Sequence, residues 1–576
     1  MIEASAGKVR RVNGPVVEVT GLKGIAAAEL LEVGPERLPG EAIMIREGVV
    51  TAQVYAYTGG LAPGAEAHGL GRPLSVALGP GLLGGVFDGT MQSLGDAGEM
   101  LSVADRLLPR AGRRWDFQPR ARAGDDVAGG TVLGVIQETP AIEHRLLVPP
   151  GMRGKLTWIA DAGAHSSDEP LATIGTDLRI QFSSNWPVRK PRPVAERLPA
   201  GQPLVTGQRV LDLLYPIAKG STACVPGGFG TGKTMLLQQM AKWSDADVIV
   251  YVACGERGNE MADVLDEFPR LVDARSGRSL MDRTVIIANT SNMPVMAREA
   301  SIYTGVTIAE YFRDMGYHSM VIADSTSRWA EALREFASRT GQLPAEEGYP
   351  AALSSNLAAF YERAGYARTL AGAEASVTVI GAVSPPGGDM TEPVTAHTTR
   401  FVRSLWSLDR DLAYARHYPA VGWTDSFSRD AERLASWHAA RGDPLWGARR
   451  ERVIALLGES DRLRSVAELI GRTALPDRER VVLLAAELIR EAVLQQSALS
   501  TNDAYCTPPK QAALMDAVLR VYDRCIDLVR AGVPASLIEG VDLSALARAK
   551  DLGGPQDTEA AATAADQLLA QLEAIK

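Results

Sequence analysis

Short runs of alternating apolar and polar residues fill the first third of the chain. From Lys8 to about Gly69, β-branched runs are separated by Gly, Pro and charged residues, as in strands joined by tight turns. This pattern predicts a small antiparallel barrel within residues 1–72. Residues 106–192 are again Gly-rich with hairpin-like runs, so we expect a second, inserted all-β module there.

The pattern changes between about Pro203 and Ser384. Compact apolar runs alternate there with segments of helical period, which is typical of a parallel sheet with crossover helices. Strands are expected at 222–225, 247–253, 284–290, 319–324 and 376–384, and helices at 235–243, 294–315 and 328–339. We assign this α/β domain to residues 193–432. Beyond Arg433, amphipathic stretches rich in Ala, Leu, Glu and Arg predict a helical domain over 433–576.

Length and charge narrow the possible functions. A chain of 576 residues is too long for a single core. Its 60 basic and 69 acidic side chains give a net charge of −9, which argues against a nucleic-acid-binding protein. No apolar stretch resembles a signal peptide or a membrane span. We therefore expect no membrane-spanning segment, and any membrane role would have to be exerted through partners.

Cysteines and a local arginine cluster add two smaller expectations. Four cysteines without a CxxC pair favour a reducing compartment. For Cys224 and Cys254 we expect small apolar filling rather than a redox bridge. Six arginines open the inserted module, and they form either a solvated face or a docking surface for a protein. They are Arg106, Arg110, Arg113, Arg114, Arg120 and Arg122.

The most informative string is GGFGTGKT, which fits G-x-x-x-x-G-K-[ST] between an expected strand and an expected helix. In such a loop, backbone N–H groups and the helix N-terminus surround phosphate oxygens, the lysine reaches the β- and γ-phosphates, and the hydroxyl binds Mg²⁺. The alternative is a Gly-rich turn with a solvent-exposed lysine, which the strand–loop–helix setting disfavours. The predicted phosphate-binding residues are Gly227, Gly228, Phe229, Gly230, Thr231, Gly232, Lys233 and Thr234.

Acidic side chains follow two other expected strands. Asp324 ends an apolar run, so it would lie at the carboxyl edge of the sheet and help to hold Mg²⁺, largely through water. Its structural alternative is an N-cap for the following helix. Glu256, Arg257 and Glu260 follow the second strand. A carboxylate there suits a water-positioning role, which we assign to Glu256, although helix-start charge and surface pairing are the alternative for all three.

Together these strings resemble the catalytic A subunits of archaeal-type and vacuolar-type rotary ATPases. The resemblance rests on PGGFGTGKT, CGERGNEM, ADSTSRWAEALREF, PAEEGYPA and VSPPGGDMTEPVT, and it runs from about Arg189 to Tyr418. It implies a RecA-like P-loop core preceded by a β-barrel and an inserted all-β module and followed by a helical bundle.

The resemblance also assigns roles to individual residues. Lys233 and Thr234 would contact phosphate and Mg²⁺. Asp324 would be the magnesium-associated acid, and Glu256 would polarise the attacking water with Glu260 in the same shell. Arg257 and Arg328 would lie near the γ-phosphate as positively charged catalytic groups. Tyr418, and less clearly Tyr505, would stack on the adenine of ATP or ADP. For Tyr505, ordinary core packing is the alternative.

The same resemblance implies partners and a peripheral position at the cytoplasmic face of a membrane. The chain would hydrolyse or synthesise ATP in a hexamer of three A and three non-catalytic B subunits, with ion transport of protons or sodium. The B subunit would supply an arginine finger. Central rotor stalk subunits would lie inside the ring, a peripheral stalk would dock on the inserted module, and the membrane sector would be reached only indirectly.

Two departures from the family pattern stand out. Gly228 occupies a position usually held by Pro or Ala, and QSLGDA at 92–97 replaces an Arg-Pro-Leu run. Two other functional classes remain as alternatives. A ring-shaped nucleic-acid translocase would need a basic, aromatic-rich surface, whereas this chain is acidic and 6% aromatic. A non-catalytic ring subunit would lack the equivalents of Lys233 and Glu256.

Overall fold

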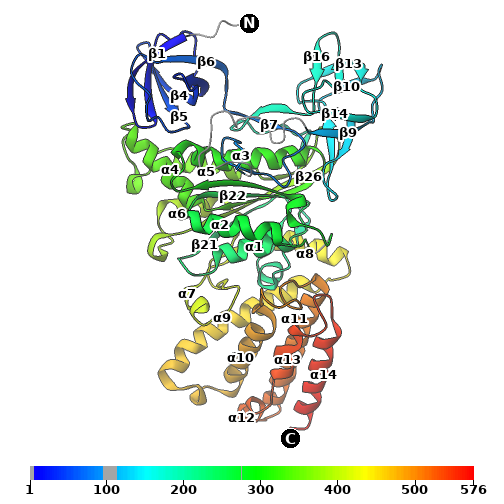
Figure 1. Ribbon diagram of the computed structural model, residues 1–576. Coiled ribbons are helices and arrows are strands. Elements are labelled where there is room, and N and C mark those ends of the chain that lie inside the picture. Colours follow the sequence, from blue (N-terminus) through cyan, green and yellow to red (C-terminus); the bar gives the residue numbers. More distant parts are fainter. Residues whose placement is uncertain (1–5, 95–112, 274–275, 576) are drawn as a thin grey trace. The chain divides into compact units, whose positions relative to one another are not determined.

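The computed structural model describes residues 6–94, 113–273 and 276–575 (Figure 1). The chain divides into two compact units. The first comprises Met1–Ala200, Ala246–Val383 and Thr391–Phe401, and the second comprises Gly201–Asp245, Ser384–Met390 and Val402–Lys576. Each unit is described separately below.

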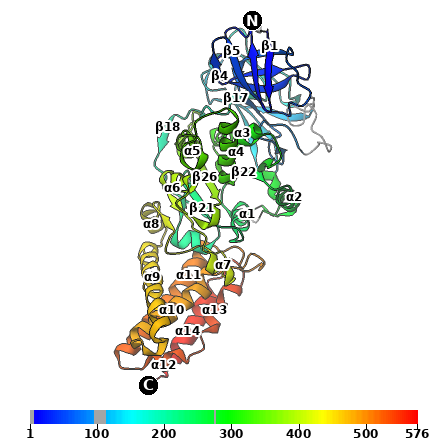
Figure 2. The same ribbon diagram turned by 90° about the vertical axis from the view of Figure 1, so that its left-hand side faces the viewer.

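The first unit begins with the predicted barrel, which is confirmed (Figure 2). Its strands are β1 (Ala6–Asn13), β2 (Val16–Thr20), β3 (Glu29–Val33), β4 (Leu38–Arg46), β5 (Val49–Val54) and β6 (Glu66–Pro73). They close in the order β1-β2-β5-β4-β3-β6. Apolar residues such as Val17, Val19, Leu31 and Val33 fill the interior, because successive side chains of a strand point to opposite faces.

The inserted module is all-β, as expected. Its strands are β9 (Arg114–Pro119), β10 (Asp126–Ala128), β11 (Val132–Gln137), β12 (Glu143–Leu147), β13 (Arg153–Ile159), β14 (Gly163–Ser166), β15 (Ala172–Ile174) and β16 (Leu178–Ile180). They form two four-stranded sheets, β10-β13-β15-β16 and β12-β11-β9-β14. The core between them contains Trp115, Phe117, Leu133, Leu156 and Phe182. Flanking strands β7 (Ser75–Leu78) and β17 (Ser184–Pro187) pair antiparallel with each other.

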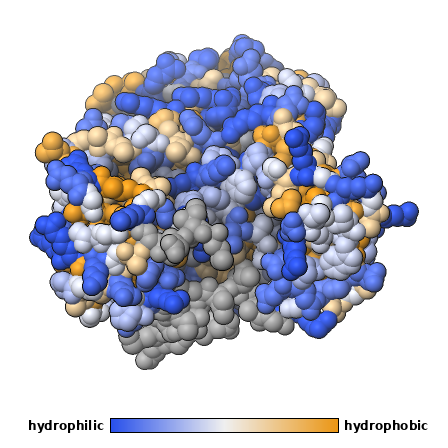
Figure 3. Space-filling view, turned by 90° about the horizontal axis from the view of Figure 1, so that it is seen from above, coloured by the Kyte–Doolittle hydropathy of each residue, from blue (hydrophilic) through white to orange (hydrophobic). Residues whose placement is uncertain are grey.

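Part of the arginine cluster can be placed. Arg113, Arg114, Arg120 and Arg122 are all exposed, whereas Arg106 and Arg110 lie outside the described residues. Of the stretch 92–97, only residues 92–94 are described. Polar and charged residues cover much of the face that Figure 3 shows, and apolar residues appear there in separate patches.

The rest of the first unit is a parallel sheet with helices. Strands β26 (Glu374–Val383), β24 (His318–Asp324), β22 (Val248–Glu256), β23 (Thr284–Thr290) and β8 (Val86–Phe87) pair in that order, and β25 (Gly365–Arg368) joins β26 to β18 (Glu196–Leu198). The helices are α2 (Gly258–Glu267), α3 (Val295–Asp314), α4 (Thr326–Arg339), α5 (Leu353–Tyr361) and α6 (Pro393–Phe401). Helices α3 and α4 pack on β22 and β26, and α2 contacts β22 and β23. Strands β22 and β26 are buried almost throughout, as in sheets covered on both faces.

The second unit combines a small α/β part with the C-terminal helices. Its α/β part contains β19 (Pro203–Leu204), η2 (Val210–Leu214), β20 (Ile217–Ala218), β21 (Thr222–Pro226), α1 (Lys233–Trp243), β27 (Ser404–Leu405), α7 (Arg410–Tyr414) and β28 (Phe427–Ser428). Strand β21 is parallel to β27, which is antiparallel to β28.

The expected helical C-terminus is confirmed (Figure 1). It consists of α8 (Ala431–Ala440), α9 (Trp446–Ile470), α10 (Asp477–Leu488), η8 (Ile489–Leu494), α11 (Pro508–Arg530), α12 (Ala535–Glu539), α13 (Ser544–Arg548), η9 (Ala549–Asp551) and α14 (Glu559–Glu573). Helix α11 packs against both α10 and α14. Among the described residues, no helix combines the length and the apolar character needed to cross a bilayer.

Candidate nucleotide-binding site

The phosphate loop lies between β21 and α1, in the strand–loop–helix setting that its sequence predicts. Gly230 and Gly232 have φ angles of +78° and +88°, which side-chain-bearing residues rarely adopt. A Cβ on Gly227 would come within 2.7 Å of Thr231 Oγ1 and 2.8 Å of Leu408 Cβ. The path of the loop therefore requires glycine at these three positions.

Gly228, the position that departs from the family pattern, is different. Its φ lies outside the left-handed region, and a Cβ there would meet only Arg410 Nη2, at 3.8 Å. The loop thus accepts a side chain at 228 without rearrangement. The glycine leaves the unfolded chain more freedom, but the folded loop does not depend on it.

Hydrogen bonds hold the side chains of Lys233 and Thr231 against the loop backbone. Lys233 Nζ donates to the carbonyl oxygens of Gly227 at 2.5 Å and Gly228 at 3.1 Å. Thr231 Oγ1 donates to Gly228 O at 2.8 Å and closes the loop on itself. Thr234 is exposed in the first turn of α1. An ammonium group, a hydroxyl and the N-terminus of a helix are thus gathered where an anion such as a phosphate can bind.

The two candidate tyrosines have different surroundings in the second unit. A Cβ on Gly232 would lie 3.4 Å from the ring of Tyr418, which is 41% exposed and so offers a free aromatic surface beside the loop. Tyr505 stacks on Trp243, with ring centroids 5.3 Å apart and an interplanar angle of 21°. A Cβ on Gly207 would come 2.2 Å from the Tyr505 ring. Packing against Trp243 and Gly207 therefore covers much of the surface of the Tyr505 ring.

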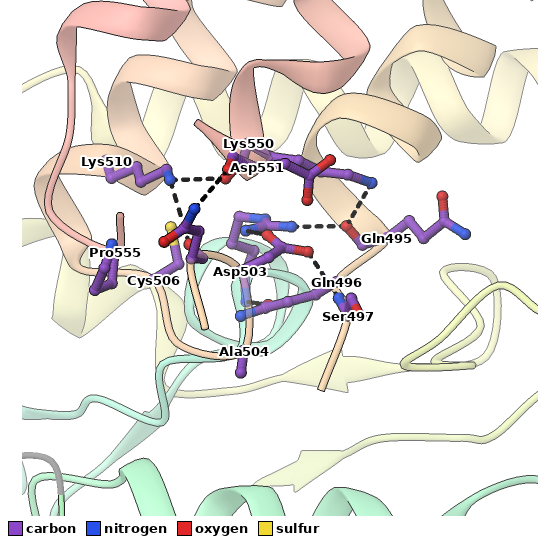
Figure 4. Close-up of polar contacts among 12 residues, drawn as sticks. Gln495, Gln496, Ser497, Asp503, Ala504, Cys506, Lys510, Lys550, Asp551 and Pro555 are labelled. Atoms are coloured by element: carbon purple, nitrogen blue, oxygen red, sulfur yellow. Dashed lines mark hydrogen bonds and ion pairs between the residues drawn. The ribbon is translucent and has the colours of Figure 1, made fainter. Parts of the chain in front are cut away.

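Buried charges anchor the loop that carries the second of these tyrosines (Figure 4). Arg209 Nη1 contacts Asp503 Oδ1 at 2.6 Å, and both side chains are fully buried. Arg209 Nη2 also donates to Gln495 O at 2.7 Å. The Lys510 ammonium donates to several backbone carbonyls, among them Lys550 O at 2.7 Å. These charged groups donate hydrogen bonds to the carbonyl oxygens in place of water, and hydrogen bonds from charged donors are strong. They therefore hold the loop against the segments that contain Gln495 and Lys550.

In the first unit, two acidic residues end neighbouring strands. Glu256 is the last residue of β22 and Asp324 the last of β24, and the register pairs Ala253 with Asp324. Asp324 is only 4% exposed, and Tyr251 Oη donates to its Oδ2 at 3.1 Å. The N-cap of α4 is Ser325 rather than Asp324, so helix capping does not account for this carboxylate.

Crowding of acidic groups perturbs the Glu256 carboxyl. Burial, a hydrogen bond with Glu260 and the charges of Asp324 and Glu260 raise the pKa of Glu256 to about 9, against a pull in the opposite direction from Arg328. Near neutral pH this carboxyl therefore holds its proton in the nucleotide-free protein. Strongly perturbed carboxyls of this kind are concentrated at functional sites.

Arg328 lies next to these acids. A Cβ on Gly255 would be 3.0 Å from Arg328 Cβ, so the arginine crosses the bend at the end of β22. Its guanidinium pairs with Glu331 at 3.0 Å. Burial works to lower the pKa of Arg328, but Glu331 and Glu256 outweigh it and leave the pKa raised. Arg257 is exposed at the N-cap of α2 and makes no capping bond with its side chain.

Three residues that contact the candidate site residues were not identified from the sequence. Tyr251 lies inside an apolar strand, and only the strand register brings it to Asp324. Glu331 follows Arg328 by three residues, a helical spacing that could have suggested the pair. Trp243 ends α1 and meets its partner from a segment far along the chain, which no local pattern predicts.

Comparison with known protein families agrees with this architecture. Residues 9–71 match the ATP synthase alpha/beta family beta-barrel domain, and residues 108–189 match the alpha/beta subunit barrel-sandwich domain. Residues 207–428 match the nucleotide-binding domain of the same family, and residues 435–537 match the C-terminal domain of V and A type ATP synthase.

Individual relatives align along nearly the whole chain. The V-type ATP synthase alpha chain of Nitrosococcus oceani is 50% identical over 94% of this chain and 93% of its own. The alpha chain from an Anaeromyxobacter species is 50% identical over 99% of this chain and 100% of its own. The A subunit of the A-type ATP synthase from Thermococcus onnurineus is 48% identical over 92% and 93%. The chain therefore belongs to the ATP synthase alpha/beta family, as a catalytic A subunit of the V-type and A-type rotary ATP synthases.

Proposed function

We propose that the phosphate loop and the acidic strand ends act on one nucleotide, ATP or ADP with Mg²⁺, during ATP hydrolysis or synthesis coupled to proton or sodium transport. The observation that carries this proposal is the loop from Gly227 to Thr234, where three glycines are required by geometry and Lys233 is held against the loop carbonyls. A loop of this shape in a member of an ATP synthase family is suited to the phosphates of a nucleotide.

The donor set suits magnesium. The Thr234 hydroxyl and the Asp324 carboxylate are hard oxygen ligands, and Mg²⁺ typically takes one or two such protein ligands together with water and substrate phosphates. When bound, Mg²⁺ would neutralise charge on the phosphate oxygens. The loop N–H groups and Lys233 would bind the phosphates directly, with the Phe229 side chain, 87% exposed, at the loop tip.

The acidic residues and two arginines would carry the remaining catalytic roles. Glu256 would orient the attacking water and accept its proton, and Glu260, its hydrogen-bond partner, would order the same water shell. To act as a base, Glu256 must first lose the proton that its raised pKa retains. Arg328 favours that loss and, with Arg257, would stabilise negative charge on the phosphoryl group.

The adenine would stack on Tyr418, whose ring is exposed beside the loop. Tyr505 would line the same pocket through its stack on Trp243.

Membership of a multi-subunit ATP synthase family supports the partner proposal. Three copies of this chain would alternate with three non-catalytic B subunits in a ring that encloses the central rotor stalk. The peripheral stalk would dock on the inserted module, and the membrane sector would be reached only through these partners. An arginine finger from the B subunit would raise the rate by about 10³–10⁵-fold. The purified chain alone is therefore expected to be nearly inactive, and full turnover by a monomer would contradict this assignment.

The test uses the assembled ring with Glu256→Gln. We expect turnover to fall by at least about 100-fold while MgADP binding, measured by equilibrium dialysis, is retained. The matched variant Lys233→Ala should lose nucleotide binding as well. Undiminished turnover with Glu256→Gln would show that this carboxyl does not position the water.

A further inference from the structure

A cavity of about 370 Å³ lies within the first unit, and its lining residues are distinct from the site residues assigned above. The inserted module contributes the segments around Leu146–Met152 and Arg179–Ile180, α3 contributes Tyr311 and Asp314, and Arg192 comes from the chain that follows β17. The volume falls within the range of small-molecule sites. Aliphatic and aromatic side chains, including Val148, Phe182 and Trp186, form much of its wall.

The buried charged residues that contact one another next to this cavity include more guanidinium groups than carboxylates. Arg192 Nε donates to Asp314 Oδ2 at 2.6 Å, and Arg313 donates to Asp314 Oδ1 at the same distance. Arg363 pairs with Glu310 at 2.6 Å, and Glu310 also accepts the backbone N–H of Arg192 at 2.9 Å. All five side chains are buried. Three guanidinium groups thus contact two carboxylates, and this set of contacting residues retains one positive charge.

Arg192 lines the cavity together with its partner Asp314. Arg192 Nη1 is buried and has no hydrogen-bond partner, although its Nε is paired. The guanidinium carbon lies 4.7 Å from the ring centre of Trp186 and 5.5 Å from that of Tyr311. Two aromatic faces thus hold a cation that lines the cavity. Nη1 itself is closed off from the cavity, but the Arg192 side chain keeps 5% of its surface accessible, so an anion in the cavity would be attracted by the guanidinium charge.

A second arginine lies at the cavity. Arg179 in β16 is exposed and lines the same space, so it adds positive charge at the side from which a ligand would arrive. A phosphate or sulfate alone would leave the apolar wall unused. We infer that this cavity binds a small organic anion, a carboxylate carried on a flat apolar body. The carboxylate would pair with Arg179 and Arg192, and the apolar body would lie against Trp186 and Phe182.

The experiment uses the full-length chain and two matched probes, para-fluorobenzoate and para-fluorobenzamide, followed by ¹⁹F NMR line broadening. The two probes have the same ring and differ in charge. We expect the benzoate to bind with saturation and the benzamide to bind at least about ten-fold more weakly, which corresponds to about 1.4 kcal/mol. Equal binding of both probes would overturn the assignment of an anion site.

Variants locate the binding. Arg179→Gln removes an exposed charge, so the fold should be kept, and it should weaken benzoate binding about ten-fold. Arg153→Gln, which removes an exposed arginine of the same module that does not line the cavity, should change nothing. Trp186→Leu should weaken both probes, because it removes the aromatic wall and leaves the charges in place. Benzoate binding that is insensitive to both Arg179→Gln and Trp186→Leu would place the probe elsewhere and refute the inference.

Nucleotide binding provides an internal reference. The inference does not rest on the proposed catalytic roles, and MgADP binding to the Arg179→Gln variant should be unchanged. A chain that binds MgADP but shows no saturable benzoate binding at millimolar probe would also overturn the inference. Conversely, benzoate binding would remain a valid result in a Lys233→Ala chain that no longer binds nucleotide.

Discussion

The Tyr251 hydroxyl donates a hydrogen bond to Oδ2 of Asp324, with 3.1 Å between the two oxygen atoms, across two neighbouring strands of a buried sheet. Both residues are nearly inaccessible to water. The tyrosine therefore satisfies one lone pair of the acid that we assign to the magnesium shell, and it fixes the orientation of that acid.

Replacing this tyrosine by phenylalanine tests the pair. Tyr251→Phe keeps the ring but removes one hydrogen-bond donor from a buried carboxylate. We expect the free energy of unfolding to fall by about 1–3 kcal/mol. If Asp324 serves Mg²⁺, the concentration of Mg²⁺ that gives half-maximal ATPase activity in the assembled ring should rise. Tyr303→Phe, on α3, is the control, and an equal effect on the Mg²⁺ requirement there would contradict the assignment.

The raised pKa of Glu256 makes the stability of the nucleotide-free chain depend on pH. The folded carboxyl titrates near pH 9 and the unfolded one near its ordinary 4.5, so the folded state binds the extra proton between these values. Stability therefore decreases as pH rises through this window. The amide side chain of Glu256→Gln has no such proton to lose. At pH 8 the free energy of unfolding of this variant should therefore exceed that of the parent by about 1–3 kcal/mol, after allowance for the exposed part of the side chain. The difference should vanish near pH 4.

Chemical denaturation at several pH values measures this difference. The matched variant is Glu260→Gln, which removes the hydrogen-bond partner and should bring the pKa of Glu256 down. A constant difference between Glu256→Gln and parent across the pH range would show that the Glu256 carboxyl titrates alike in the folded and unfolded states, without a raised pKa.

The glycines of the phosphate loop are expected to differ in their tolerance. Gly228→Ala meets only a distant arginine atom, so it should stabilise the chain by about 0.4–1 kcal/mol with nucleotide binding intact. Gly230→Ala forces a side chain into a φ of +78° and should destabilise the loop by about 1–2 kcal/mol. Thermal unfolding with and without MgADP distinguishes the two. Equal effects of the two substitutions would mean that the loop adopts a different path.

The two candidate tyrosines should respond differently to substitution. Tyr505→Ala removes a stacked ring from Trp243 and should lower the free energy of unfolding by about 2–4 kcal/mol. Tyr418→Ala removes a ring that is 41% exposed, so its cost should stay below about 1 kcal/mol. If Tyr418 stacks on adenine, the dissociation constant of MgADP should rise about ten-fold in this variant alone. An unchanged constant would remove Tyr418 from the base pocket.

Local patterns predicted much of this molecule because the relevant signals are short-range. The barrel, the inserted module, the five expected strands and the helical C-terminus follow from periodicity and turn residues. The glycine requirement at 227 and 232 follows from the phosphate-loop motif, whereas 230 is a variable position of that motif and its requirement comes from the observed φ angle. Strand β22 extends three residues beyond its expected end and reaches Glu256 through an irregular step, which periodicity alone does not reveal.

Long-range pairing could not be predicted in the same way. Arg192 meets Glu310 and Asp314 from more than a hundred positions away, and Arg209 meets Asp503 from still farther. Nothing in the neighbourhood of any one of these residues specifies its partner. The pairs depend on how helices and loops pack, and so does the cavity beside Arg192.

The division of the chain has a mechanical consequence. Residues 201–245 and 402–576 belong to the same compact unit, so the phosphate loop and the C-terminal helices share one body. The buried Arg209–Asp503 pair fastens them, since Arg209 precedes the loop and Asp503 follows η8. A displacement of the loop on nucleotide exchange would then be transmitted through this buried pair towards the C-terminal helices.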